Sequence, residues 1–371
     1  MSHIKEFIKR EITLCAAFAA ALISAFFVPP DREYLGYIDW RTLALLYCLM
    51  VVVSGLRGAG VFSSLAHYLC ARAGSVRTMG TILVALCFVS AMFLTNDVAL
   101  LTFVPFAVVV LGMSGEIKTL SWVVVLQTVA ANLGSMLTPV GNPQNLYLYS
   151  HYGLSMGKFL AITGPIWGLS ALLIGGLCFL LPKGKVSVFL GEKPDLNQKD
   201  LWVYAALFGL CMLVVFRVLP WPVMLGILAV CLLVYERKAL LRADFMLLVT
   251  FVCFFIFSGN LRRINAVAIL LQRLLKGHEM WMGVAVSQVI SNVPAAILLS
   301  GFTDQAKELL LGVNIGGLGT PIASLASLIS LKLYSHSDNA DSKHYMGKFL
   351  LINGALLVIL LAAGYFLSAK K

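Results

Sequence analysis

Two stretches of the sequence decide its fold, because each places helix-breaking residues inside an apolar segment. The first is Gly134-Ser135-Met136-Leu137-Thr138-Pro139-Val140-Gly141-Asn142-Pro143-Gln144-Asn145, and the second is Gly316-Gly317-Leu318-Gly319-Thr320-Pro321-Ile322-Ala323-Ser324. Non-helical backbone is tolerated at membrane depth only where protein encloses it or where it lines a watery cavity. Each stretch therefore predicts a broken span beside a binding site. A proline kink bent only for packing is the alternative.

The composition places both stretches in a membrane protein. Of the 371 residues, 60% are hydrophobic and 12% are charged, against about 45–50% and about 25% in soluble domains. About 20 consecutive apolar residues span a bilayer. We predict crossings at 11–29, 41–56, 119–148, 157–181, 201–217, 219–235, 243–258, 306–331 and 347–368.

The positive charge of the chain indicates its orientation in the membrane. The formal net charge is +11, and the basic residues lie in short loops between apolar runs. Lys and Arg collect in cytoplasmic loops, so we predict an inner or plasma membrane protein with a cytoplasmic N-terminus and its C-terminus outside. Nucleic acid is not an expected partner. The eight cysteines are scattered singly and predict neither disulfides nor a zinc site.

The chain contains an internal repeat. Four matches occur in the same order in both halves: Ser54-Gly55-Leu56-Arg57 with Ser258-Gly259-Asn260-Leu261-Arg262, Thr95-Asn96-Asp97 with Ser291-Asn292-Val293, Asn132-Leu133-Gly134 with Asn314-Ile315-Gly316, and Met156-Gly157-Lys158-Phe159-Leu160 with Met346-Gly347-Lys348-Phe349-Leu350. We predict a first repeat at 1–181, a linker loop and extra span at 182–218, and a second repeat at 219–371. The odd number of crossings between equivalent points predicts that the second repeat is inverted.

Segments 78–115 and 280–303 are predicted to be re-entrant helical hairpins. The first is too long for one span, and in the second each side of Asn292 is too short to cross the bilayer core. Asn96 and Asn292 would then lie at the hairpin tips. The competing interpretation has two spans at 78–115 and one kinked span at 280–303. Segments 60–72 and 264–276 have a basic face and predict helices that lie in the membrane interface.

Asp97 is the one acidic residue set deep within a long apolar segment. An ionisable group there indicates a functional site, and Asp97 could bind a cation or carry a proton. It could also simply cap the second hairpin helix. Its repeat mate is Val293, so any role that depends on charge is confined to one half.

Together these motifs resemble the ion transporter superfamily, which includes arsenite permeases, related sodium/proton antiporters, citrate transporters and divalent anion/sodium symporters. The resemblance runs from about residue 11 to 368. It implies cation sites at Thr95, Asn96, Gly134, Ser291, Asn292 and Gly316, with Na⁺ as the metal, and the position of Asp97 within an apolar segment adds Asp97 to these candidates. It places Asn96, Asn292, Thr138, Pro139, Asn142, Thr320, Pro321 and Ser324 near the substrate. It also implies a homodimer with elevator-type motion.

The sequence departs from the symporter pattern at the third tip position. Asp97 and Val293 stand where the symporters typically have threonine, and an Asn-Asp tip looks more like the arsenite and proton-antiporter branches. We therefore expect a secondary transporter of a small inorganic or carboxylate anion, coupled to Na⁺ or H⁺. A sodium/proton antiporter, an arsenite efflux permease and an anion channel remain open alternatives. No motif of a P-loop, a GxSxG elbow or a zincin is present, so neither catalysis nor an organic cofactor is expected.

Overall fold

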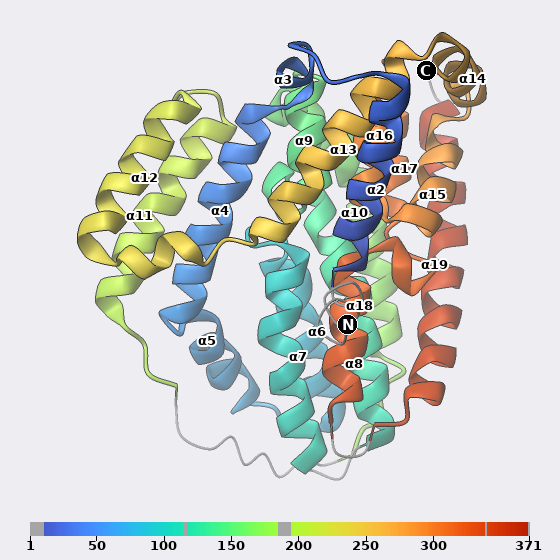
Figure 1. Cartoon of the computed structure of the whole chain (residues 1–371). Helices are drawn as coiled ribbons and strands as arrows, with labels where there is room; N and C mark the ends of the chain where they lie inside the picture. Colours follow the sequence, from blue (N-terminus) through green and yellow to red (C-terminus); the bar gives the residue numbers. More distant parts are fainter. Residues whose placement is uncertain (1–10, 114–116, 185–193, 338–339, 370–371) are drawn as a thin grey trace, which may run out of the picture.

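The protein is all-helical in the part of the chain that the structure describes. The computed structural model describes residues 11–113, 117–184, 194–337 and 340–369, which form 18 α-helices and four 3-10 turns and no strand (Figure 1). The all-α fold predicted from the sequence is confirmed. The predicted segments at 1–10 and 185–193 and the end of the first hairpin at 114–116 lie outside the described residues.

The first half contains the helices α2 to α10. They are α2 (Ile12–Phe27), α3 (Tyr34–Tyr37), α4 (Trp40–Gly58), α5 (Val61–Cys70), α6 (Val76–Ser90), α7 (Asn96–Met113), α8 (Ile117–Gly134), α9 (Pro143–His151) and α10 (Met156–Cys178). Two 3-10 turns, η1 (Ser135–Leu137) and η2 (Pro139–Gly141), separate α8 from α9.

The second half contains the helices α11 to α19. They are α11 (Gln198–Val215), α12 (Trp221–Tyr235), α13 (Phe245–Arg263), α14 (Asn265–Leu275), α15 (Glu279–Ile290), α16 (Asn292–Ser300), α17 (Ala306–Ile315), α18 (Leu325–Ser335) and α19 (Ser342–Ala369). The 3-10 turn η3 (Arg237–Leu241) precedes α13, and η4 (Pro321–Ala323) precedes α18.

Six described helices are long and apolar enough to cross a membrane. They are Trp40–Gly58, Thr119–Leu137, Met156–Cys178, Gln198–Val215, Phe245–Arg263 and Ser342–Ser368. The predicted crossings at 11–29 and 219–235 are also helical, but α2 has 16 residues and α12 has 15. At 1.5 Å per residue these helices are about 24 and 22 Å long, shorter than a bilayer core. Helix α2 ends early because Pro29 and Pro30 follow Val28.

Segment 280–303 turns back on itself. Thr303 Oγ1 donates a hydrogen bond to Glu279 Oε1 at 3.3 Å, which brings the two ends of the segment together. A single kinked span would hold these ends about 36 Å apart at 1.5 Å per residue, so that alternative is wrong for this segment. Helices α6 and α7 likewise pack against each other. In Figure 1, α7 extends to the lower end of the molecule, whereas α15 and α16 lie in its upper half.

Buried apolar side chains form two clusters. The first is built mainly on α6, α7, α8, α10, α18 and α19, and the second mainly on α2, α4, α9, α11, α12, α13 and α16. Helices α11 and α12 lie beside α4 at one edge of the molecule, and α19 lies at the other (Figure 1). Since α8 and α18 belong to the first cluster and α9 to the second, the breaks lie where the two clusters meet.

The segments predicted as interfacial are short helices with few buried residues. Helix α5 buries Ala66 and Cys70, and α14 buries Leu275. Figure 1 shows α14 at the upper end of the molecule and α5 in its lower part. This placement at different levels supports an inverted arrangement of the two halves.

Candidate functional site

Both broken spans change from α-helix to 3-10 turn at their breaks. Helix α8 ends at Gly134 before η1 and η2, and α17 ends at Ile315 before η4. Pro139 and Pro321 take the first positions of η2 and η4, where a missing N–H leaves no helical hydrogen bond unmade. The two prolines therefore shape the breaks, and their contact with substrate stays a prediction.

A threonine hydroxyl ties each break to the neighbouring hairpin. Thr138 Oγ1 donates to the carbonyl oxygen of Met92, and Thr320 Oγ1 donates to the carbonyl oxygen of Gln288 at 3.2 Å. Both acceptors lie four residues before the asparagine at the hairpin tip. The same bond is thus made twice between corresponding positions, which supports the predicted repeat.

Two buried asparagines link the broken spans to each other. Asn314 Nδ2 donates to Asn145 Oδ1 at 2.7 Å, and Asn132 Nδ2 lies 3.5 Å from Ser327 Oγ. Asn145 and Ser327 lie thirteen residues after Asn132 and Asn314 respectively. The links are therefore reciprocal, each running from one half to the other.

The first hairpin tip joins this polar network. Asn96 Nδ2 donates to Asn132 Oδ1 at 3.0 Å, and Ser324 Oγ donates to the same oxygen at 2.9 Å. All three residues are buried. The first tip, the first broken span and the second break therefore meet at one side-chain oxygen.

The second hairpin tip reaches the second break. Ser291 Oγ lies 3.4 Å from the carbonyl oxygen of Ala323 and donates to it. The Asn292 amide packs against Gly317, where an added Cβ would lie 2.9 Å from Asn292 Nδ2. The structure thus brings each tip into contact with the second break, Asn96 through Asn132 and Ser324, and Ser291 and Asn292 through Ala323 and Gly317.

Three helices begin at the breaks and the second tip without a side-chain cap. The N-cap residues of α9, α16 and α18 are Asn142, Ser291 and Ser324, and none makes a side-chain hydrogen bond to its own helix. Side-chain caps are present on α4, α6, α10, α11 and α13. Helices α2, α3, α5, α12, α14, α15 and α17 also lack one, but their N-cap residues are not buried, whereas Asn142, Ser291 and Ser324 are. Helix N-termini carry partial positive charge and free N–H groups, so this region can hold an anion.

Gly134 and Gly316 allow the first hairpin helices to approach the breaks. A Cβ at Gly134 would fall on the backbone carbonyl of Phe88 in α6, and a Cβ at Gly316 would lie 2.9 Å from Ser287 Cβ in α15. The structure gives both glycines a packing role. Their place in cation sites stays a prediction.

Asp97 does not cap the second hairpin helix, so that interpretation is wrong. The Ala99 N–H donates to the Thr95 carbonyl at 3.1 Å, which starts α7 at Asn96 and leaves Asp97 inside the first turn. The Oδ1 atom of Asp97 is buried and has no hydrogen-bond partner among the residues that the structure describes. An unpartnered carboxylate oxygen is costly at membrane depth unless a cation or a proton balances it.

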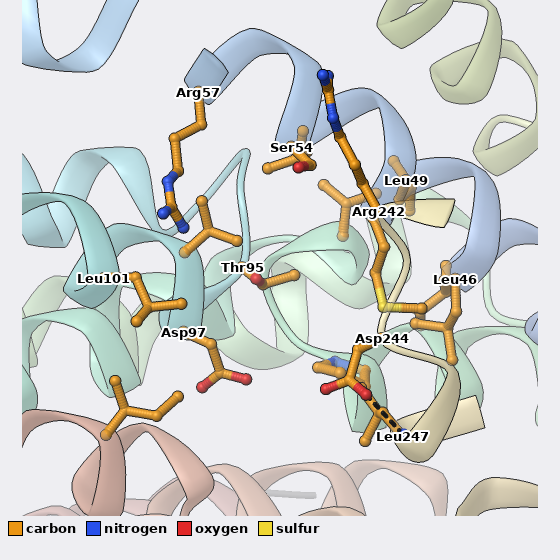
Figure 2. A pocket seen from close by; sticks show the side chains of 17 residues that line it. Leu46, Leu49, Ser54, Arg57, Thr95, Asp97, Leu101, Arg242, Asp244 and Leu247 are labelled. Carbon is orange, nitrogen blue, oxygen red and sulfur yellow. Dashed lines mark hydrogen bonds between the residues drawn. The ribbon is translucent and has the colours of Figure 1, made fainter. Parts of the chain in front are cut away.

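Asp97 faces a cavity of about 230 Å³, which we call the first cavity (Figure 2). Thr95 of the first tip and Arg57 of α4 line it, together with Arg242 and Asp244 just before α13. In Figure 2 the carboxylates of Asp97 and Asp244 extend into the same region. Both aspartates also line an adjoining cavity of about 490 Å³. The first cavity thus lies between a hairpin tip and the membrane-crossing helices α4 and α13, which we call the crossing helices.

Sequence reasoning missed Arg57 and Asp244 as cavity residues. Asp244 precedes an apolar run and its Oδ1 accepts the Leu247 N–H at 3.0 Å, as an N-cap does. That signal could have located the start of α13. It could not have placed residue 244 beside residue 97, because only tertiary packing brings them together.

Paired hairpins, two broken spans and a polar centre enclosed by long apolar helices define a membrane transport protein. A family model described as citrate transporter matches residues 5–308. The chain belongs to this family, which confirms the resemblance carried by the tips and breaks.

Relatives from distant organisms agree with the family. An inner membrane protein of Escherichia coli is 30% identical over 350 residues, covering 92% of this chain and 91% of the relative. An uncharacterized transporter of Methanocaldococcus jannaschii is 32% identical over 333 residues, covering 88% of each. A silicon efflux transporter of rice, Oryza sativa, is 34% identical over 149 residues, covering 40% of this chain and 30% of the relative.

Proposed function

We propose that this transporter is a secondary active carrier for a small inorganic or carboxylate anion, coupled to Na⁺ or H⁺. The observation that carries the proposal is the set of uncapped helix N-termini at the two breaks and the second tip. Their N–H groups, beside buried amides and hydroxyls, match the oxygens of an oxyanion or a carboxylate. Nothing in the proposal requires catalysis.

The names of the relatives point to the same chemistry. The family model is described as citrate transporter, and one relative is named a silicon efflux transporter. Citrate and silicic acid are both rich in oxygen. A site of hydrogen-bond donors is suited to either kind of solute, so we propose an oxygen-rich small acid or its anion as the substrate class.

Coupling is proposed to depend on oxygens that lack partners in the structure. Within the described part of the chain, three buried side-chain oxygens have no hydrogen-bond partner: Asp97 Oδ1, Asn142 Oδ1 and Asn314 Oδ1. Oxygen ligands suit hard cations such as Na⁺, and a carboxylate can also take up a proton. Thr95, Ser291, Gly134 and Gly316 are proposed to complete the cation sites from the tips and breaks.

The transport cycle is proposed to move the hairpins and breaks past a scaffold within a homodimer. Membership of the transporter family supports such a motion. We propose an inner or plasma membrane location with the N-terminus in the cytoplasm. Single cysteines at Arg77 and Glu279 should then label from opposite sides with a membrane-impermeant maleimide. Labelling of both from one side would contradict the inverted arrangement.

The test of the function is flux into proteoliposomes. Citrate, succinate, phosphate, sulfate, silicic acid and arsenite are each offered with and without a sodium gradient at two pH values. We expect saturable uptake of at least one of them that depends on Na⁺ or pH. Ohmic current far above carrier turnover would favour a channel instead.

A sodium/proton antiporter is the second candidate, favoured by the two carboxylates of Asp97 and Asp244 in one cavity. Opposed carboxylates suit exchange of Na⁺ for H⁺ without any anion. A pH-sensitive dye inside the vesicles separates the two functions. Sodium-driven proton movement in the absence of every tested anion would establish the antiporter and contradict the proposed anion transport.

A further inference from the structure

A second cavity mirrors the first on the other side of the crossing helices. It has a volume of about 220 Å³ and is lined by Asp39, Arg262, Ser258 and Ile297, with Tyr147 and His151 of α9. The first cavity is lined by Asp244, Arg57, Ser54 and Leu101, with the start of α9. Each cavity thus contains an aspartate, an arginine, a serine and an aliphatic residue of a hairpin helix, and the first also contains Asp97 and Arg242.

The charged residues come from the two crossing helices with their roles exchanged. Asp39 caps α4 at the second cavity, and Arg57 ends that helix at the first. Asp244 caps α13 at the first cavity, and Arg262 ends that helix at the second. In both helices the arginine lies eighteen residues after the aspartate, a rise of about 27 Å. Each helix therefore carries one charge to each side.

The packing of the crossing helices follows the same symmetry. A Cβ at Gly55 of α4 would fall on the ring of Tyr204, and a Cβ at Gly259 of α13 would fall on the ring of Tyr37. Gly55 and Gly259 are matched positions of the repeat. The likeness of the cavities is thus part of how the two helices are built and held.

The two arginines are available to a ligand. Both side chains are exposed, and neither makes a hydrogen bond or ion pair within the described ranges of the chain. The neighbouring arginines differ in this respect. Arg263 pairs with Asp31 at 2.7 Å and Arg242 pairs with Glu236. A guanidinium that is free at the wall of a cavity presents a fork of donors that fits an oxyanion or a carboxylate.

We propose that Arg57 and Arg262 form paired docking sites for the transported anion, one on each side of the membrane. This inference rests on the proposed anion transport and adds residues outside the tips and breaks. The aspartate in each cavity offsets the arginine charge, so the anion is held weakly enough to move on. Under the predicted orientation, Arg57 serves the cytoplasmic side and Arg262 the outer side.

The two docking sites differ in their charged residues. The first cavity contains Asp97 and Arg242 in addition to Asp244 and Arg57. Arg242 is paired with Glu236, so an anion at Arg57 meets two carboxylates. The second cavity contains Asp39 and the neutral donors of Tyr147, with His151 beside them. Docking at Arg57 should therefore depend on the cation or proton that neutralises Asp97, and docking at Arg262 should depend on it less.

The test measures the KM for uptake from each side separately. Right-side-out and everted membrane vesicles containing the full chain are used with radiolabelled citrate, phosphate and arsenite. Arg57→Gln should raise the KM for the anion offered from its own side by about tenfold, the loss expected for one charge-assisted hydrogen bond. Arg262→Gln should do the same from the opposite side. Arg57→Lys and Arg262→Lys should each recover part of the loss.

The matched control is Arg263→Gln, which removes an arginine already engaged in an ion pair and lining neither cavity. It should leave both KM values within about twofold of wild type, as expected for an exposed pair worth little. Unchanged KM values for Arg57→Gln and Arg262→Gln, or equal changes from both sides, would overturn the docking sites while leaving anion transport intact. Absence of saturable flux in wild type would overturn the proposed function itself, and the docking sites with it.

Discussion

The two hairpin tips occupy corresponding places but are built differently. Five residues, 91–95, separate α6 from α7, whereas Ser291 alone separates α15 from α16. Ser291 has a φ of 75°, a left-handed value that a side chain rarely adopts. The first tip carries Asp97 and the second carries Val293.

The two halves agree in the contacts that surround the tips, which we call the shared frame. The threonine bonds to Met92 and Gln288, the amide links between broken spans and the close glycines recur in both. The comparison separates two tasks. The shared frame offers a solute matching contacts from both halves. A response to protons or cations that depends on the tip charge must come from the first half, because only the first tip carries Asp97.

The largest expected effect tests the shared frame. Gly134→Ala places a Cβ on the Phe88 carbonyl, which cannot move without displacing α6. Overpacking of this kind costs about 1–3 kcal/mol and sometimes more, and we expect the high end with a large loss of thermal stability in detergent. Gly316→Ala meets the Gly312 carbonyl oxygen at 2.8 Å and the Ser287 side chain at 2.9 Å, less closely than Gly134→Ala meets Phe88, and should cost about 1 kcal/mol.

The control for the glycine pair is Gly168→Ala within α10, where an added Cβ has nothing within 4 Å. This change should raise the melting temperature slightly, because alanine favours a helix by up to about 1 kcal/mol over glycine. Equal losses at Gly134 and Gly168 would show that the close approach to α6 is not what the glycine provides.

The next effect tests the difference between the tips. Asp97→Asn preserves shape and removes charge, and Asp97→Val copies the second tip. Both should insert and fold, since Asp97 makes no capping bond that would be lost. Transport should lose its dependence on pH or Na⁺. In the wild type, coupling to one ion can change the transport rate by up to about tenfold for each tenfold change in the concentration of that ion. The measurement is proteoliposome flux against pH and sodium.

A profile for Asp97→Asn that superimposes on the wild-type profile would place coupling in the neutral oxygens of the tips and breaks instead. Asn96→Ala and Asn292→Ala serve as comparison variants. They remove buried amides without changing charge, so they should weaken substrate binding and leave the shape of the pH profile unchanged.

A smaller effect concerns the backbone of the tips. Ser291→Gly relieves the left-handed conformation, which costs about 1–3 kcal/mol for a residue with a side chain. Against this gain stand about 0.5–1 kcal/mol of added chain entropy and about 0.5 kcal/mol for the long hydrogen bond from Ser291 Oγ to the Ala323 carbonyl. We expect a net gain of up to about 1 kcal/mol in stability, seen as a higher melting temperature. Thr95→Gly has no such strain to relieve and should lower the melting temperature.

Much of the fold could be predicted from the sequence because apolar length and helix-breaking residues act locally. Those signals located α4, α8, α10 and α13, both breaks, and Asn96 and Asn292 at the tips. They overestimated the spans at 11–29 and 219–235, since hydropathy extends beyond the residues that remain helical. They also left open whether Asp97 caps α7, because the start of a helix depends on a single backbone bond.

The site was only partly predictable for a different reason. Repeat matching found Thr138 and Thr320, which bond to the neighbouring hairpins, and Asn132 and Asn314, which bond to the opposite broken spans. It did not find the cavity partners of Asp97, because Arg57 and Asp244 are ordinary helix-terminal residues in sequence. Their role depends on how α4 and α13 are placed in the folded protein, where the aspartate of one helix and the arginine of the other line the same cavity. A comparison of sequence motifs does not contain that information.

The smallest expected effect concerns the ion pairs that tie the crossing helix α13 to its neighbours at its two ends. Arg263 donates to Asp31 at 2.7 Å, and this hydrogen bond holds the pKa of the Asp31 carboxyl below its ordinary value. Glu236 accepts hydrogen bonds from both Arg242 and the Tyr204 hydroxyl. Replacing Glu236 therefore weakens two interactions and should lower stability more than replacing Asp31.

Because the pKa of Asp31 is lowered in the folded protein, the pair contributes stability at neutral pH, and that contribution is lost as the pH falls through the lowered pKa. Asp31→Asn should therefore lower the melting temperature slightly at pH 7, and the difference from wild type should shrink in strong acid. Glu236→Gln should lower it more at pH 7. Thermal unfolding of the three proteins in detergent at both pH values gives the answer. A loss for Asp31→Asn that is unchanged in acid would mean that its hydrogen-bonded geometry, and not its charge, holds α13 at that end.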